Sequence, residues 1–79
     1  MHLTVLSLKG VEFQGEAVSV NVKTTSGEIT VLDHHRPLIT ILKEGPARLT
    51  KSNGETFEIP VHSGFLEVGA GNAVNALID

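Results

Sequence analysis

The chain has 79 residues, of which 41% are hydrophobic, and its formal net charge at pH 7 is −3. This length predicts a single domain, residues 1–79, which buries roughly 60% of its unfolded surface and benefits from a partner. The acidic balance and the absence of Tyr and Trp exclude non-specific nucleic-acid binding and base stacking. Without cysteine there is no disulfide framework, and no apolar run approaches the about 20 residues needed for direct membrane insertion.

In the first part of the chain, polar and apolar residues alternate with a period of two, which is typical of β-strands. A turn is expected at Lys9-Gly10, followed by a short strand over residues 11–13. The alternation is clearest where Val18, Val20 and Val22 are interleaved with polar residues. These valines are therefore predicted to point together into a core.

The middle of the chain contains two apolar segments, Ile29–Leu32 and Leu38–Leu42. The second is nearly continuous, which predicts a strand that is buried on both faces. Further on, Asn53-Gly54 predicts a hairpin with a type I′ turn, because both residues tolerate positive φ. Pro60 lacks an N–H group, so its strand is expected at a sheet edge or at a bulge.

Phe57, Ile59 and Val61 are expected to form the buried face of the strand that returns from this hairpin. Two further strands are indicated, over 65–68 and 73–78, and no segment has the apolar spacing of a helix. Nine or ten short strands separated by turns predict an all-β domain, either a β-sandwich or a small flattened barrel of antiparallel strands.

The polar loop Asp33-His34-His35-Arg36 is the first place to look for chemistry. Asp33 and the histidines, with His62, are residue types that ligate metals. Adjacent histidines on an extended segment point to opposite faces, however, so an exposed polar loop is the favoured interpretation. Asp-His-His also occurs in DHH phosphoesterases, but those enzymes need further acidic motifs on a longer α/β chain, and we reject that reading.

The sequence contains residue types that are used in nucleophilic catalysis, but their spacing does not match a catalytic arrangement. His62 and Ser63 are neighbours on an extended segment, so their side chains should diverge, and no nucleophile elbow surrounds them. The glycines at 64, 69 and 71 precede no helix and are read as turn residues. The residues alone therefore indicate a small all-β domain that acts as a binding module, with no catalytic residue, metal or other cofactor expected. A small metal-dependent enzyme is the least favoured alternative.

Several segments, in order, resemble the N-terminal β-sandwich domain of the epsilon subunit of F-type ATP synthases, called delta in mitochondria. The order and spacing of these segments, more than any single one, carry the resemblance across nearly the whole chain. The matching segments are Val11-Glu12-Phe13-Gln14-Gly15-Glu16, Ser26-Gly27-Glu28, His35-Arg36-Pro37-Leu38-Ile39-Thr40, Lys43-Glu44-Gly45, Ser63-Gly64-Phe65-Leu66-Glu67-Val68 and the final strand from Val74 to Ile78.

The resemblance implies a ten-stranded sandwich that serves as a rotor component with no chemistry of its own. It implies binding to the gamma subunit and to the polar loops of the membrane c-ring, hence a peripheral place at the cytoplasmic face of the membrane. Glu28 and His35 match the family's c-ring-facing positions, and Thr40 and Glu67 match its gamma-facing positions. The alternative is a stand-alone β-sandwich module with another partner.

The sequence departs from the family pattern in three places. Asp33 and His34 replace a proline and a glycine, and Thr30 replaces another glycine, so the loop is expected to be reshaped if φ is positive there. His62 and Ser63 stand where the family has Ser and Gly, which suggests a different gamma contact. The family usually continues into a two-helix domain, and this chain stops at residue 79. We therefore expect this polypeptide to lack helix-mediated inhibition and the family's ATP site.

Overall fold

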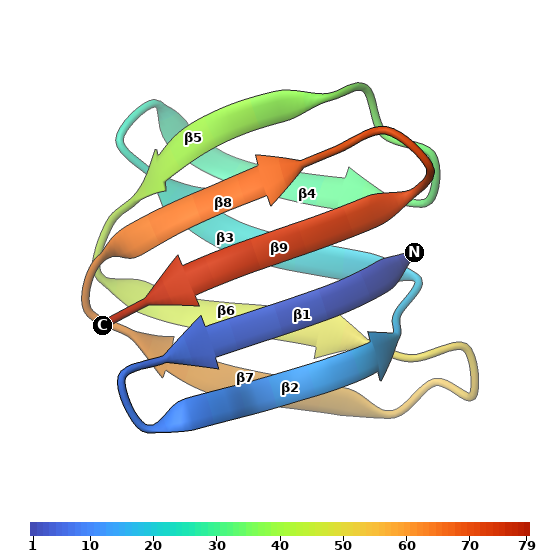
Figure 1. Ribbon diagram of the computed structural model, residues 1–79, viewed down its shortest axis with the longest axis horizontal. Helices are drawn as coiled ribbons and strands as arrows, with labels where there is room; N and C mark the ends of the chain where they lie inside the picture. The colour runs from blue at the N-terminus through green and yellow to red at the C-terminus, as the bar shows by residue number, and fades with distance from the viewer.

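A computed structural model describes all residues, 1–79, and contains nine β-strands and no helix. Each strand is five to seven residues long, and tight turns join most of them (Figure 1). The strands are β1 (His2–Ser7), β2 (Gly10–Glu16), β3 (Ser19–Thr24), β4 (Gly27–Leu32), β5 (Leu38–Leu42), β6 (Gly45–Thr50), β7 (Thr56–Val61), β8 (Gly64–Val68) and β9 (Ala73–Ile78).

The strands form two layers, which confirms the all-β sandwich or flattened barrel. One layer has the order β5-β8-β9-β1-β2 and the other the order β4-β3-β6-β7, so that five strands cover four (Figure 1). A single register pair, Thr24 with Leu42, joins the two layers through β3 and β5. All pairings are antiparallel except that of β1 with β9. The count is nine strands, one fewer than the resemblance implies.

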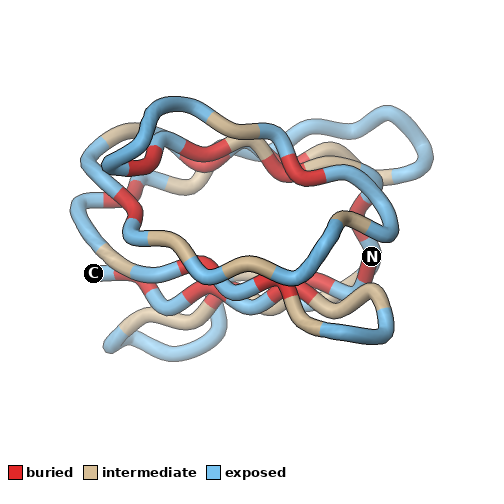
Figure 2. The backbone as a smooth tube through the Cα atoms, turned by 90° about the horizontal axis from the view of Figure 1, so that it is seen from above, coloured by how far each residue is buried: buried red, intermediate tan, exposed pale blue.

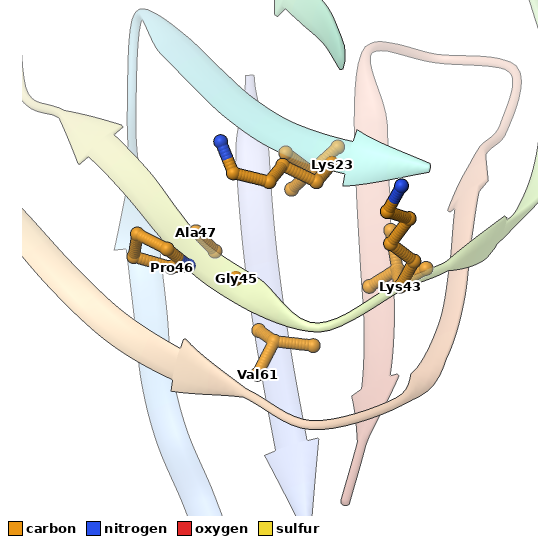
Figure 3. A pocket seen from close by; sticks show the side chains of 8 residues that line it. Lys23, Lys43, Gly45, Pro46, Ala47 and Val61 are labelled. Carbon is orange, nitrogen blue, oxygen red and sulfur yellow. The ribbon is translucent and has the colours of Figure 1, made fainter. Parts of the chain in front are cut away.

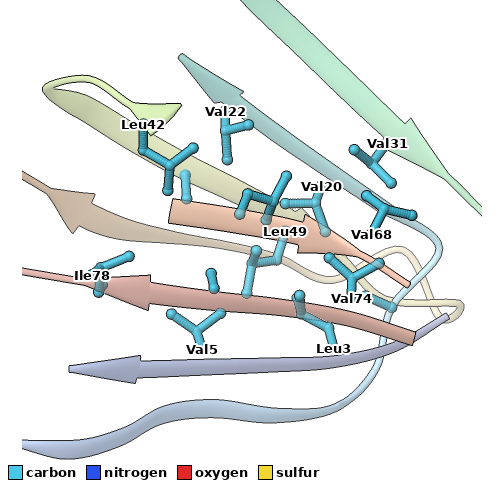
Figure 4. Packing of buried hydrophobic residues seen from close by; sticks show 14 of the residues in the cluster. Leu3, Val5, Val20, Val22, Val31, Leu42, Leu49, Val68, Val74 and Ile78 are labelled. Atoms are coloured by element: carbon cyan, nitrogen blue, oxygen red, sulfur yellow. The ribbon is translucent and has the colours of Figure 1, made fainter. Parts of the chain in front are cut away.

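The core lies between the two layers, and buried positions alternate with exposed ones along both of them (Figure 2). Val20 and Val22 are buried as their alternation predicted, but the prediction is wrong for Val18, which precedes β3 and is 36% exposed. Leu3, Leu49 and Leu66 are completely shielded from solvent. These side chains meet in one apolar cluster of 16 residues (Figure 4). No buried side-chain nitrogen or oxygen lacks a hydrogen-bond partner, so the core carries no polar penalty.

At the lower edge in Figure 1, β2 and β7 close the sandwich through Phe13 and Phe57, whose ring centroids are 6.1 Å apart. Phe57 shares the inner face of β7 with Ile59 and Val61, as predicted, but it remains 41% exposed because it lies at the strand end. Pro60 lies on this strand, which pairs only with β6, and the prediction of an edge strand is confirmed.

Two local predictions are wrong. Residues Leu38–Leu42 are not buried on both faces, since Ile39 and Ile41 are 73% and 52% exposed while Leu42 is buried. The hairpin between β6 and β7 is present, but only Gly54 has positive φ, so its turn is not type I′. The Gly54 N–H donates to the Lys51 carbonyl instead, and Asn53 Oδ1 accepts from the Glu55 N–H. That side-chain bond favours a longer turn over the two-residue one.

A further correction concerns β2, which runs over Gly10–Glu16 and does not end after residue 13. Its pairing with β1 shifts by one residue between Val5 and Leu6, so β2 carries a bulge opposite that step. The extra residue keeps Phe13 on the core side, opposite Val5, while Val11 pairs with Leu6.

Candidate protein-interaction surfaces

The four residues implied by the resemblance lie on three different parts of the sandwich. Glu28 is exposed near the start of β4, paired in register with Lys23, and His35 is half-buried in the loop after β4. Between Glu28 and the strand end at Leu32 the backbone extends about 13 Å. The two residues expected at the c-ring are therefore at opposite ends of one edge strand.

The turn before Glu28 is held by Thr24, the only buried polar residue of the chain. Its hydroxyl donates to the Gly27 carbonyl at 2.6 Å and accepts from the Ser26 N–H at 3.1 Å. Gly27 has a φ of 117°, which a residue with a side chain rarely adopts. These contacts hold the turn and give Glu28 a fixed position.

The loop that carries His35 is anchored on both sides. His34 has a φ of 60°, and its N–H donates to Asn72 Oδ1 in the β8–β9 loop at 2.7 Å. The His35 N–H donates to the Leu32 carbonyl, and its Nδ1 lies 2.7 Å from the Arg36 carbonyl. His34 stands where the family has a glycine and itself takes the left-handed backbone conformation that a glycine would favour, so no reshaping is needed at this position.

Asp33 connects the same loop to the start of the chain. Its carboxylate accepts hydrogen bonds from the N-terminal ammonium group of Met1 and, at 3.4 Å, from Asn72. The ammonium group holds the pKa of the Asp33 carboxyl below its usual range, and Asn72 contributes in the same direction. Asp33 thus has a structural role, and this loop holds half-buried His35 and exposed Arg36 in a defined conformation.

Thr40 and Glu67, both expected at gamma, lie on opposite faces of one layer. Thr40 is half-buried on the core side of β5, opposite buried Leu66. Glu67 is exposed on the outer face of β8, opposite Ile39 and Asn75. A partner with one flat surface could therefore contact Glu67 directly, but it would contact Thr40 only by extending around the outer edge of β5.

The outer face of the five-stranded layer carries a line of large apolar side chains that the sequence reading missed. Register places one residue of each strand beside the next: Ile41 with Phe65, Phe65 with Leu77, Leu77 with Leu6, and Leu6 with Val11. Four of them are exposed, and Leu6 is half-buried. We call these five residues the apolar row.

Two further apolar side chains border the apolar row, Ile39 on β5 and Leu8 in the β1–β2 turn, the latter 97% exposed. An open hollow of about 560 Å³ lies at this end of the layer, lined by Leu8, Ile41 and Phe65 among others. The signal was present in the sequence as consecutive apolar pairs, such as Phe65-Leu66, since neighbouring residues of a strand face opposite sides.

The outer face of the four-stranded layer is polar and internally paired. Asn21 donates to the Thr30 hydroxyl across β3 and β4 at 2.9 Å, and Arg48 forms an ion pair with Glu58 across β6 and β7 at 2.8 Å. Leu32, at the end of β4, is its main exposed aliphatic residue. The two outer faces therefore differ: the four-stranded layer presents polar groups that pair across its strands, and the five-stranded layer presents a line of exposed apolar side chains.

The pattern of side chains offers no arrangement for catalysis. His62 Nδ1 faces Glu44 Oε2 at 3.6 Å, whereas the Ser63 hydroxyl faces Asp79 Oδ2 at 3.4 Å, so the predicted divergence is confirmed. No three His, Asp or Glu side chains are grouped as a metal site. The cleft between β3 and the start of β6 is filled, because the Lys23 stem covers Gly45 and leaves no room for a water molecule (Figure 3).

The structure thus defines a small β-sandwich with one apolar outer face and no active-site constellation. The family model of the beta-sandwich domain of the ATP synthase delta/epsilon chain matches residues 1–79. The chain belongs to this family. The structure contains no helix that could span a membrane.

The relatives agree with this assignment. An ATP synthase epsilon chain from Streptomyces avermitilis is 38% identical over 66 residues, which is 84% of this chain and 53% of that protein. The epsilon chain of Dichelobacter nodosus is 46% identical over 56 residues, 71% of this chain and 39% of that protein. The chain therefore spans about half the length of the relatives it matches.

Two solved structures share the fold. In the mitochondrial ATP synthase of Euglena gracilis, described as OSCP, F1 and c-ring, one chain superimposes with a TM-score of 0.92 at 20% identity, over 99% of this chain and 49% of that one. In the central stalk and c-ring of the Tetrahymena thermophila mitochondrial enzyme, the TM-score is 0.83 at 13% identity, over 99% and 62%. At these identities the likeness concerns the fold alone.

Proposed function

We propose that this chain is a non-catalytic central-stalk component of a rotary F-type ATP synthase. In this role it links the gamma subunit to the polar loops of the c-ring and so couples proton translocation to ATP synthesis. The observation that carries the proposal is the family match over residues 1–79, on a sandwich that has an apolar outer face and no catalytic arrangement. The chain would be held peripherally at the cytoplasmic face of the membrane by its partners.

For the contact with gamma we propose the outer face around Glu67. This carboxylate lies among exposed apolar side chains, with Phe65 two residues earlier on the same face and Ile39 opposite. Such a mixture of apolar centre and charged border is the usual composition of a protein interface. Thr40 would contribute at the edge of β5, where the layer ends.

For the contact with the c-ring we propose Glu28 and His35. Glu28 lies at the start of β4 and His35 lies in the loop that follows its end, and the turn and the anchored loop that carry them fix their positions. Two fixed polar contacts about a strand length apart suit a junction that transmits torque, since neither depends on a deep pocket.

The gamma contact is tested by titrating the isotopically labelled chain with the gamma subunit of the same enzyme and recording NMR shifts. We expect shifts at Glu67 and Thr40 and their neighbours, with Glu28 and His35 unaffected. An absence of shifts at micromolar concentrations would show that the partner is not gamma.

The c-ring contact is tested in the assembled enzyme with cysteine cross-linking. Glu28→Cys should cross-link to a cysteine in the polar loop of the c-ring, whereas Glu58→Cys, on the outer face of the four-stranded layer, should not. Equal yields for the two variants would contradict the proposed orientation.

A further inference from the structure

The turn between β6 and β7 contains two neighbouring residues that can react with each other, Asn53 and Gly54. Both are exposed to solvent. A glycine has no side chain to shield its backbone nitrogen, and nothing lies within 4 Å of the place where a Cβ of Gly54 would be. The Gly54 nitrogen is therefore accessible as a nucleophile toward the side-chain amide carbon of Asn53. The other asparagines precede valine or alanine; they are Asn21, Asn72 and Asn75.

We propose that Asn53 is a site of spontaneous deamidation, and that the hydrogen bonds of its turn slow this reaction in the folded chain. The Gly54 nitrogen forms a bond to Asn53 Cγ, the bond from Cγ to Nδ2 breaks, and Nδ2 leaves as ammonia with the proton that Gly54 gives up. Water then opens the cyclic imide at either of its carbonyls, which leaves aspartate or isoaspartate. Water is the only co-reactant, and no residue is oxidised or reduced.

Three hydrogen bonds oppose the reaction. The Gly54 N–H donates to the Lys51 carbonyl at 2.9 Å, so the nucleophile is engaged elsewhere. Asn53 Nδ2 donates to Glu55 Oε1 at 2.8 Å, and Asn53 Oδ1 accepts from the Glu55 N–H at 2.9 Å. The bond from Nδ2 to a carboxylate is of the stronger, charge-assisted kind, and it must break before Nδ2 can leave. Glu55 is thus the positioning residue that restrains Asn53.

Glu55 is itself held from the other side of the turn. Its carbonyl accepts from the Lys51 N–H at 2.8 Å, and its Oε1 lies 3.9 Å from Lys51 Nζ. An exposed turn nevertheless opens at a smaller free-energy cost than the paired strands beside it. The reaction therefore proceeds from the native chain through local opening, at a rate that the Glu55 contacts set.

The products would not restore the turn. An aspartate at position 53 has no N–H to donate to Glu55, and its carboxylate would face the carboxylate of that residue, which is unfavourable. Isoaspartate also routes the backbone through the side chain and so lengthens the turn that sets Thr50 opposite Thr56. Deamidation therefore removes the contacts that opposed it and loosens this end of the hairpin.

The inference concerns the chain alone and does not depend on the proposed function. It is tested by incubating the purified chain in a mildly alkaline buffer and following each asparagine by peptide mass spectrometry. We expect the mass gain of deamidation at Asn53 well before it occurs at Asn21, Asn72 or Asn75. In urea that unfolds the chain, the rate at Asn53 should rise at least about tenfold, because all three hydrogen bonds are lost.

A substitution at Glu55 tests the restraint in the folded chain. Glu55→Ala should accelerate deamidation of Asn53 at least about threefold, because it removes the acceptor of Nδ2. The matched control is Glu58→Ala, which removes a carboxylate of the same hairpin that pairs with Arg48 instead, and it should leave the rate unchanged. Both residues are exposed, so both variants should fold.

In urea the two variants should react at the rate of the parent chain, since the restraint belongs to the folded turn. The inference is overturned if Asn53 reacts no faster than the other asparagines, or if urea leaves its rate unchanged. It is also overturned if Glu55→Ala fails to accelerate the reaction, or if Glu58→Ala accelerates it equally. None of these outcomes bears on the contacts with gamma or the c-ring.

Discussion

His34 and Asn72 are the two non-glycine residues with left-handed backbone conformations, and a hydrogen bond joins their loops. Such a conformation is tolerated by Asn and His more readily than by most residues. Because the Asn72 side chain bonds both the His34 N–H and the Asp33 carboxylate, one amide organises the loop that presents His35. A strained pair of residues thus gives the candidate c-ring contact its shape.

At the scale of a single residue, Asp33 should make stability depend on acidity. Its pKa is below the ordinary value in the folded chain because of the N-terminal ammonium group, so its stabilising contribution is present above the unfolded-state pKa of about 3.9. It is lost as the pH falls through the folded pKa. Thermal unfolding of the chain and of Asp33→Asn should therefore differ at neutral pH and converge in acid.

The matched control for this prediction is Glu55→Gln, since that carboxylate lies in a different loop. Raising the salt concentration should shrink the effect of Asp33→Asn, because the pair is partly exposed and is screened. A difference between the two chains that persists at pH 2 would contradict the role of the ion pair.

Gly64 is restricted by contact rather than by backbone conformation alone. A Cβ added there would lie 2.2 Å from the Leu77 carbonyl oxygen, on a backbone that cannot easily move because β8 and β9 are paired. Gly64→Ala should therefore cost about 3 kcal/mol in the free energy of unfolding, measured with urea. Gly10→Ala, with positive φ but nothing within 4 Å, should cost only about 1 kcal/mol.

At the scale of the element, β5 shows that an apolar run does not by itself reveal which faces are buried. Its core side holds Leu38, Thr40 and Leu42, and its outer side holds Ile39 and Ile41. The isoleucines are exposed because nothing packs on the outer face of this layer, which also leaves Phe65 exposed on the interior strand β8. A sequence pattern records the side chains but not what covers them.

This reading of β5 predicts a large difference between adjacent residues. Leu42→Ala should lower the free energy of unfolding by about 2–5 kcal/mol because it leaves a cavity in the core. Ile41→Ala should lower it by less than about 1 kcal/mol, since Ile41 is already half exposed and little apolar surface is lost from the core. Similar costs at both positions, measured by urea unfolding, would mean that the outer face is covered.

Most of the architecture was predictable from the sequence, and its exceptions have local causes. The valines of β3 and the edge position of β7 at Pro60 followed from alternation and from the missing N–H. The turn at Asn53-Gly54 did not, because the Asn53 side chain bonds the backbone and selects a longer turn. The apolar row also escaped prediction, because it is made by register between strands distant in the sequence.

At the scale of the whole molecule, the contrast between the two outer faces is the property that matters for function. The four-stranded layer pairs its polar groups across strands, so it gains little from a partner. The five-stranded layer leaves large apolar side chains in water, and a partner that covers them stabilises the folded chain by binding only that state. In the proposed central-stalk role, this coupling would make attachment to the partner and stability of the fold depend on each other.

The whole sandwich should also unfold as one unit, because its first and last strands are neighbours. The parallel pairing of β1 with β9, including Leu3 opposite Val74, joins the two ends of the chain inside one layer. Leu3 is completely buried, so Leu3→Ala should cost about 3 kcal/mol, which is more than a hundredfold in amide exchange rate. We expect this acceleration at the most protected amides of β6 and β3 in the other layer as well as in β1 and β9. Leu8→Ala, at a fully exposed position, should leave these rates unchanged. An acceleration limited to β1 and β9 would show instead that the five-stranded layer opens on its own. A partner bound to the outer face of that layer would then not stabilise the four-stranded layer, which includes β4.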